Sequence, residues 1–247
     1  AHHHDFAWER KRFLINAVQD FLLYAFPPNL QCIRHVVINS EASRQLSYQR
    51  GVSNVIVHNV FDFGNPPQTA NQKSRLLRQE LGFVDNDLFL LQPTRIVPRK
   101  WIERAVELAS LLEMEHPRVV VSHEYGDEGD VYAERILEFA ERLGVKIIYI
   151  GDMIGPLRCF NMKSDKGYAI DDAYQAADIV SYPSGYEGFG NAFLEAVYFK
   201  KPIVVNRYSI FVEDIEPCGF DVIAFESFVT KGIVERLKAF LEPTNLN

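Results

Sequence analysis

The sequence predicts an α/β fold built on a doubly wound parallel sheet. Short apolar runs recur along most of the chain, and near-continuous Val, Ile and Leu runs are typical of strands that are covered on both faces. A helical pattern follows these runs, and this alternation is typical of a parallel sheet that binds ligands at the carboxyl ends of its strands. The expected strands are residues 88–92, 119–122, 146–150, 178–182, 202–206 and 221–225.

Helical spacing of apolar residues marks the segments between these strands. In residues 101–114, for example, Ile102, Ala105, Val106 and Ala109 recur every three or four positions, as they would on one buried helix face. The expected helices are residues 101–114, 131–143, 171–177, 191–199 and 228–241.

The amino-terminal part of the chain carries its own elements. Residues 6–24 are predicted to form a helix, which Pro27 ends. Residues 35–40 are predicted to form a strand, and Ser40 is expected to cap a helix that begins at Glu41.

A polar stretch with prolines and no periodicity, FGNPPQTANQ, indicates a linker after these elements. The prediction therefore has four parts, which are an amino-terminal part at residues 1–57, a linker at 58–72, a larger domain at 73–241 and a tail at 242–247.

Composition restricts the class of protein. The chain has 247 residues, of which 47% are hydrophobic, and a formal net charge of −7 with no basic run, so nucleic acid is not an expected partner. Its three cysteines, expected to be buried or half-buried thiols, are few and odd in number, which fits a reducing compartment. No apolar run approaches the roughly 20 residues of a spanning helix. We expect a cytoplasmic protein, and peripheral contact with a membrane surface remains open.

A glycine-rich turn follows the fourth expected strand. Gly188 and Gly190 let backbone amides approach a ligand closely, and Asn191 begins a helix whose amino end favours anions. Glu187 lies in this turn, and Glu195 lies eight positions later, about two turns into the helix. Two carboxylates that face one cleft can accept hydrogen bonds from sugar hydroxyls. The alternative is that both are surface groups, one of them solvated and the other paired with a lysine.

Basic residues follow the first strand of the larger domain. Arg95, Arg99 and Lys100 lie within QPTRIVPRK, at the carboxyl end of that strand, where a diphosphate needs fixed positive charge. The alternative is an ordinary solvated loop.

Together the two segments resemble the donor-binding domain of retaining glycosyltransferases with the GT-B fold, specifically glycosyltransferase family 4, the group 1 glycosyltransferases. The basic motif of that family has an arginine and a lysine five positions apart, as Arg95 and Lys100 are here. Its E-x7-E motif is matched by Glu187 and Glu195. Trp101 departs from the pattern, because the family usually has glycine after the lysine.

The resemblance covers about residues 35–225 and implies a fold. Residues 73–241 would form the Rossmann-like, nucleotide-sugar-binding domain of a GT-B enzyme. Residues 1–57 would be the carboxyl-terminal end of a second Rossmann-like domain, which binds the acceptor. Most acceptor contacts would then come from a missing amino-terminal domain or a companion chain.

The resemblance also implies roles for individual residues. Arg95 and Lys100 would bind the donor diphosphate and stabilise the charge on the leaving nucleotide without a metal. Glu187 would contact the donor sugar near its reacting carbon, and Glu195 would hold the ribose hydroxyls. The rest of the donor pocket would be formed by Gly188, Phe189, Gly190 and Asn191.

A histidine completes the expected site. Family members carry a histidine at the end of a strand in the amino-terminal domain, which implies this role for His4, with His3 as the alternative. The role requires AHHH to be native sequence, as we interpret it, and not the remnant of a tag.

The resemblance implies a retaining glycosyltransferase that transfers a hexose from UDP-glucose or GDP-mannose to a hydroxyl acceptor, with no cofactor and no metal ion. Two alternatives remain open, namely a non-catalytic nucleotide-sugar-binding fragment and a GT-B sugar phosphorylase.

Overall fold

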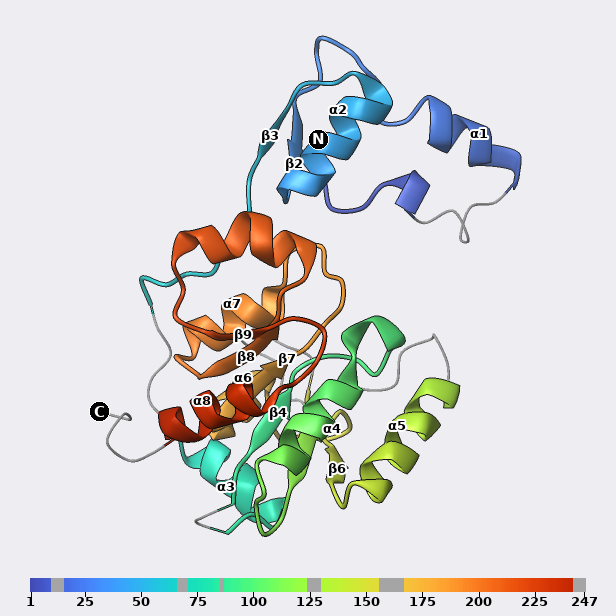
Figure 1. Ribbon diagram of the computed structural model, residues 1–247. Helices are drawn as coiled ribbons and strands as arrows, with labels where there is room; N and C mark the ends of the chain where they lie inside the picture. The colour runs from blue at the N-terminus through green and yellow to red at the C-terminus, as the bar shows by residue number, and fades with distance from the viewer. Residues whose placement is uncertain (10–15, 66–70, 85–86, 124–129, 156–166, 242–247) are drawn as a thin grey trace. The chain divides into compact units, whose positions relative to one another are not determined.

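The computed structural model describes residues 1–9, 16–65, 71–84, 87–123, 130–155 and 167–241, and these residues belong to two compact units (Figure 1). Unit 1 comprises Ala1–Val60, Glu187–Gly190 and Ser209–Phe220. Unit 2 comprises Phe61–Tyr186, Asn191–Tyr208 and Asp221–Asn247.

Unit 2 is built on a six-stranded parallel sheet with the strand order β6-β5-β4-β7-β8-β9. The chain begins in the middle with β4, adds β5 and β6 on one side, and then returns to add β7, β8 and β9 on the other. Ligands bind in such sheets where the order reverses, which here is beyond the carboxyl ends of β4 and β7. The predicted fold class is confirmed. The strands are β4 (Leu90–Gln92), β5 (Arg118–Val121), β6 (Lys146–Tyr149), β7 (Ile179–Tyr182), β8 (Ile203–Asn206) and β9 (Ile223–Phe225).

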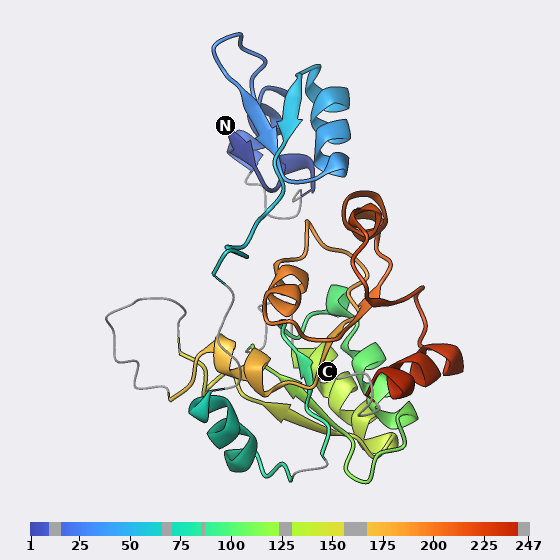
Figure 2. The same ribbon diagram turned by 90° about the vertical axis from the view of Figure 1, so that its left-hand side faces the viewer.

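Helices cover both faces of this sheet (Figures 1 and 2). One face carries α4 (Ile102–Leu111), α5 (Asp130–Arg142) and α8 (Lys231–Leu241). The other carries α3 (Gln72–Glu80), α6 (Ile170–Ala176) and α7 (Asn191–Tyr198). Val119, Val121 and Ile179 are fully buried in the sheet, and each such side chain stabilises the fold by about 1.5–3 kcal/mol. The continuous apolar runs are therefore explained by burial on both faces.

Unit 1 contains a three-stranded parallel sheet of β1 (His2–His3), β2 (His35–Val37) and β3 (Asn54–Ile56), in that order. Helix α2 (Ser40–Arg50) connects β2 to β3, and its Leu46 packs with Val37 and Phe6 in a small core. Unit 1 also includes a π-helical turn, η4 (Phe211–Ile215), and a 3-10 turn, η5 (Glu216–Cys218).

The structure corrects the predicted cap of α2. Asn39, and not Ser40, is the capping residue, with an extended backbone at φ −152° and ψ 169°. Its side-chain Oδ1 accepts a hydrogen bond from the backbone N of Ala42 at 2.6 Å. The helix ends at Gly51, whose φ of 61° is a conformation that favours glycine.

The predicted helix at residues 6–24 is wrong at its start, where the chain forms a 3-10 turn, η1 (Ala7–Glu9). Residues 10–15 lie outside the described residues, and α1 covers Asn16–Tyr24. Phe6 is buried against Trp8, with the rings stacked 4.4 Å apart, so packing in the unit 1 core decides this local structure. The short strands β1 and β3 and the helix α3 were not predicted.

The four-part division of the chain stays a prediction, and its tail, residues 242–247, lies outside the described residues. Cys32 and Cys218 are exposed free thiols, which corrects the expectation of burial, whereas Cys159 lies outside the described residues. Among the described helices, none combines the length and the apolar character that crossing a membrane requires.

Candidate functional site

The basic loop after β4 lies at the carboxyl end of the sheet, where the strand order reverses. Pro98 begins a 3-10 turn, η3 (Pro98–Lys100), which turns the chain back toward α4. Arg95 is exposed, whereas Lys100 is only 8% exposed and its Nζ lies 5.6 Å from the centroid of the Tyr182 ring on β7. The lysine charge is thus fixed between the two central strands.

Trp101 connects this loop to the turn after β7. Its backbone has φ 48° and ψ 48°, a left-handed conformation that suits glycine better than tryptophan. Its indole ring lies against Gly185, where a Cβ atom would be 2.5 Å from two ring carbons. The backbone N of Gly185 also donates a hydrogen bond to the carbonyl oxygen of Arg99 at 2.9 Å. The two loops are therefore in direct contact.

Asn206, at the end of β8, supports the same turn from the other side. Its Nδ2 donates to the carbonyl oxygen of Ser184 at 2.9 Å, and its Oδ1 accepts from the backbone N of Ser227 at 2.9 Å. The Ser184–Gly185 turn is held by neighbours on both sides of β7, which fixes the direction in which the chain leaves the sheet.

His123 lies close enough to Lys100 and Arg95 to be affected by their charges, and it was not among the predicted site residues. It follows β5 directly, and its Nδ1 lies 2.8 Å from the Ser122 hydroxyl oxygen. Desolvation lowers the pKa of the His123 imidazole, and the positive charges of Lys100 and Arg95 lower it further. Its place at the carboxyl end of a central strand was the available signal. Residues 124–129, which follow it, lie outside the described residues.

Glu195 accepts a hydrogen bond from a buried tyrosine of α6. The Tyr174 hydroxyl donates to Oε2 of Glu195 at 2.8 Å, and its ring stacks on Phe199 with centroids 5.1 Å apart. Burial raises the pKa of the Tyr174 hydroxyl well above its ordinary value, and the Glu195 carboxylate adds to this rise. The hydroxyl therefore stays protonated and orients the carboxylate.

The loop Glu187–Gly190 belongs to unit 1, whereas Asn191 begins α7 in unit 2. Glu187 is a buried carboxylate, 7% exposed. The Phe189 ring stacks on His58 with centroids 5.0 Å apart. Gly190 has φ 111°, which only glycine adopts readily, so this position explains one glycine of the motif.

The two candidate histidines differ in environment. His3 is buried in β1, and its Nε2 lies 2.9 Å from Nδ1 of His35 on β2. Burial lowers the pKa of His3, and its neighbour His35 acts in the same direction. His4 follows the end of β1 and is exposed, so of the two it is the histidine available to a ligand.

The structure brings the predicted residues together in three local groups. The positive charges of Lys100 and Arg95 lower the pKa of His123, the Tyr174 hydroxyl donates a hydrogen bond to Glu195, and the His58 ring stacks on Phe189. Within the described ranges, no group of three or more His, Cys, Asp and Glu side chains is arranged to hold a metal ion.

Comparison with known proteins identifies the family. Residues 160–246 match the family model described as "Glycosyl transferases group 1". The mannosylglucosylglycerate synthase of Thermotoga maritima is 33% identical over 254 residues, which cover 95% of this chain and 57% of that relative. The enzyme of the same name from Petrotoga mobilis is 31% identical, over 92% of this chain and 56% of its own length.

The chain belongs to the group 1 glycosyl transferases. It spans a little over half the length of the two curated relatives. Among solved structures, Anabaena Alr3699/HepE in complex with UDP and glucose matches 98% of this chain and 61% of its own, with a TM-score of 0.63 and 20% identity. That likeness supports the fold alone, and it confirms the predicted GT-B architecture with parallel sheets.

Proposed function

We propose that this group 1 glycosyl transferase moves a mannosyl group from a nucleotide diphosphate sugar to a hydroxyl acceptor, with retention at the transferred carbon. GDP-mannose is favoured over UDP-glucose as donor, because both curated relatives are named for a mannosyl product. Their names also favour an acceptor such as glucosylglycerate, which carries a carboxylate. Further acceptor contacts would come from another part of the amino-terminal domain or from a companion chain.

The observation that carries this proposal is the position of Lys100. It lies at the point where the sheet order reverses, beside Tyr182, and the next residue, Trp101, packs against Gly185. A buried cation at this edge of a doubly wound sheet suits a diphosphate, because ligands of such sheets bind there and a desolvated charge interacts strongly. Arg95 adds a second positive charge from the same loop.

The proposed chemistry relies on electrostatic stabilisation. As the bond between the sugar and the phosphate breaks, negative charge grows on the diphosphate, and Lys100 and Arg95 stabilise it. The acceptor hydroxyl attacks from the face that the diphosphate leaves, and a departing phosphate oxygen takes the acceptor proton. The sugar passes through an oxocarbenium-like state, and no covalent enzyme intermediate is needed.

The remaining residues bind and orient the donor. Glu195, oriented by Tyr174, accepts hydrogen bonds from ribose hydroxyls. Glu187 contacts the sugar near its reacting carbon as a positioning group. We also propose donor-binding roles for His4 and for the backbone of Gly188, Phe189, Gly190 and Asn191.

The proposed reaction needs no metal ion, because lysine and arginine neutralise the diphosphate. Transfer should therefore continue in the presence of a strong chelator. Loss of transfer on chelation, with recovery when a divalent cation is added back, would contradict this part of the proposal.

Calorimetric titration with GDP, UDP, GDP-mannose and UDP-glucose tests the donor site. We expect selective binding of the guanosine ligands and loss of that binding in Arg95→Ala. A coupled assay of mannosyl transfer to glucosylglycerate tests the reaction. Binding of the donor without transfer would favour the non-catalytic binding module, and equal binding of all four ligands would contradict the assigned donor.

A further inference from the structure

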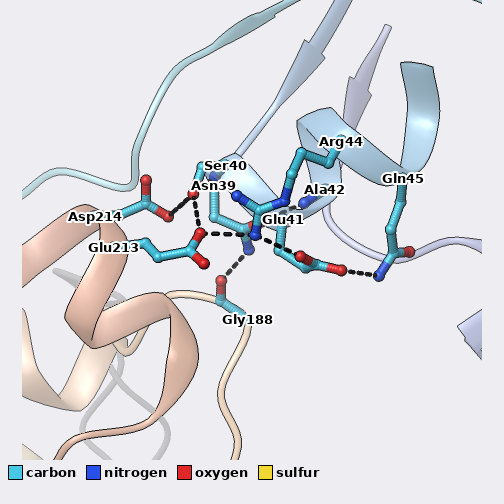
Figure 3. A network of polar contacts seen from close by, with 9 residues as sticks. All are labelled: Asn39, Ser40, Glu41, Ala42, Arg44, Gln45, Gly188, Glu213 and Asp214. Atoms are coloured by element: carbon cyan, nitrogen blue, oxygen red, sulfur yellow. Dashed lines mark hydrogen bonds and ion pairs between the residues drawn. The ribbon is translucent and has the colours of Figure 1, made fainter. Parts of the chain in front are cut away.

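The first turn of α2 holds the loop Glu187–Gly190 through one side chain (Figure 3). Asn39 is 5% exposed and caps α2 through its Oδ1, which accepts from the backbone N of Ala42. Its Nδ2 donates a hydrogen bond to the carbonyl oxygen of Gly188. One amide group thus connects a helix terminus to the loop that carries Glu187.

Only one orientation of this amide satisfies both contacts. The Ala42 partner is an N–H donor and the Gly188 partner is a carbonyl acceptor, so the oxygen must face α2 and the nitrogen must face the loop. Because the group is buried, each contact that is lost leaves an unsatisfied polar atom. The asparagine is therefore fixed in place by both partners.

A second contact holds the same loop one residue later. His58 lies two residues after β3. Its Nδ1 is 2.9 Å from the carbonyl oxygen of Ile38, within hydrogen-bond distance, and its ring stacks on Phe189. Ile38 itself lies close to Gly188, where an added Cβ would be 3.6 Å from its Cδ1. Residues that follow β2 and β3 thus hold both Gly188 and Phe189.

We propose that Asn39 is a positioning residue for the donor sugar, because it holds the backbone next to Glu187 in the orientation that transfer requires. This inference rests on the proposed function, since it assumes that Glu187 contacts the sugar. Asn39 touches no reacting atom in this account and acts through the loop. Loop position sets the distance between Glu187 and the sugar, so the effect should appear in turnover and not in nucleotide binding.

A separate ionic network lies on the same helix turn and offers a matched control (Figure 3). Ser40 donates from its backbone N and its Oγ to Oδ2 of Asp214, at 3.0 and 2.9 Å. Arg44 donates to Glu213 at 2.7 Å and to Glu41 at 2.6 Å, and its side chain is 56% exposed. Arg44→Ala removes both of these ion pairs from α2 and leaves the residues of the contact between Asn39 and Gly188 unchanged.

The decisive variant is Asn39→Asp. Aspartate caps a helix as well as asparagine does, so the contact with Ala42 remains. It has no donor, so its carboxylate faces the Gly188 carbonyl without a hydrogen bond. We expect faster amide hydrogen exchange in peptides that cover Glu187–Gly190. With GDP-mannose as donor, kcat should fall on the order of 10- to 100-fold, whereas the affinity for GDP should change less than about twofold.

The outcomes separate the inference from the proposed function. Wild-type loop exchange or wild-type kcat in Asn39→Asp overturns the inference alone. Equal losses of kcat in Asn39→Asp and Arg44→Ala also overturn it, because they would indicate a general effect of loosening α2. Absence of transfer by the unmodified chain, under conditions in which it binds GDP-mannose, contradicts the proposed function instead.

Discussion

The indole ring of Trp101 occupies the space that a side chain at position 185 would need. A Cβ on Gly185 would lie 2.5 Å from two carbons of the ring, a distance that real Cβ atoms do not show. The tryptophan itself has a left-handed backbone, at φ 48°. The bulky residue at 101 and the glycine at 185 thus depend on each other, and they bring the loops after β4 and β7 into contact.

Gly185→Ala is expected to destabilise the protein through this contact. The added methyl must displace the indole ring, and such overpacking costs about 1–3 kcal/mol in the free energy of unfolding. Chemical denaturation measures this cost. In a Trp101→Gly background the same substitution should cost less than half as much, because the ring is gone. An equal cost in both backgrounds would show that the ring does not cause the effect.

Lys100→Ala is expected to weaken nucleoside diphosphate binding by about 1.5–3 kcal/mol, the range for a hydrogen bond to a charged group. Calorimetry with GDP measures this change. Lys146→Ala is the matched control, because Lys146 is an exposed lysine at the first residue of β6, at the other end of the strands. Unchanged GDP affinity in Lys100→Ala would remove this lysine from the site.

Tyr174→Phe is expected to lower the free energy of unfolding by about 1–3 kcal/mol, because it removes a buried hydrogen bond to a carboxylate. It should also weaken GDP binding, since Glu195 loses the group that orients it. Tyr168→Phe is the control, because the Tyr168 hydroxyl binds Glu80 at an exposed position and its loss should cost less than about 0.5 kcal/mol. Equal effects of the two substitutions would contradict the role of Tyr174.

His123 is expected to make stability depend on pH in one direction. Its pKa in the folded state lies below the ordinary value of 6.5, so the unfolded chain binds the proton more readily. Its contribution to stability is therefore fully present above pH 6.5 and is lost as the pH falls below 6.5 through the lower pKa of the folded state. Denaturation of the wild type and of His123→Gln at pH 7.5 and 5.5 measures this contribution. The loss between the two pH values should be smaller in His123→Gln, and equal losses would contradict the assignment.

The central sheet was predictable from sequence because its strands are buried on both faces. Runs such as the one containing Val119 and Val121 leave no polar face, and that pattern indicates a parallel sheet directly. The unit 1 elements gave weaker signals. Strands β1 and β3 are two and three residues long, and Val55 on β3 is 62% exposed, so neither periodicity nor burial marks them.

The assigned roles of the candidate site residues stay predictions, but the structure shows which of their contacts the sequence could not indicate. Arg95, Lys100, Glu187 and Glu195 could be selected because their spacing matches two motifs of the family that the chain resembles. The partners that hold these groups could not be selected in this way. Tyr174 lies 21 residues from Glu195, and Asn39 lies 149 residues from Gly188, so only the folded chain shows these pairs.

Unit 1 has a consequence for the order in which the chain can be assembled during synthesis. Asp214 is made 174 residues after Ser40, its partner on α2. At about 5–20 residues per second, that interval lasts on the order of 10–35 s. Throughout this time Asp214 is not available to the first turn of α2, and Gly188, made 149 residues after Asn39, is available only near its end. The amino-terminal sheet can form early, but the polar end of α2 stays in water until Gly188 and Asp214 have been translated.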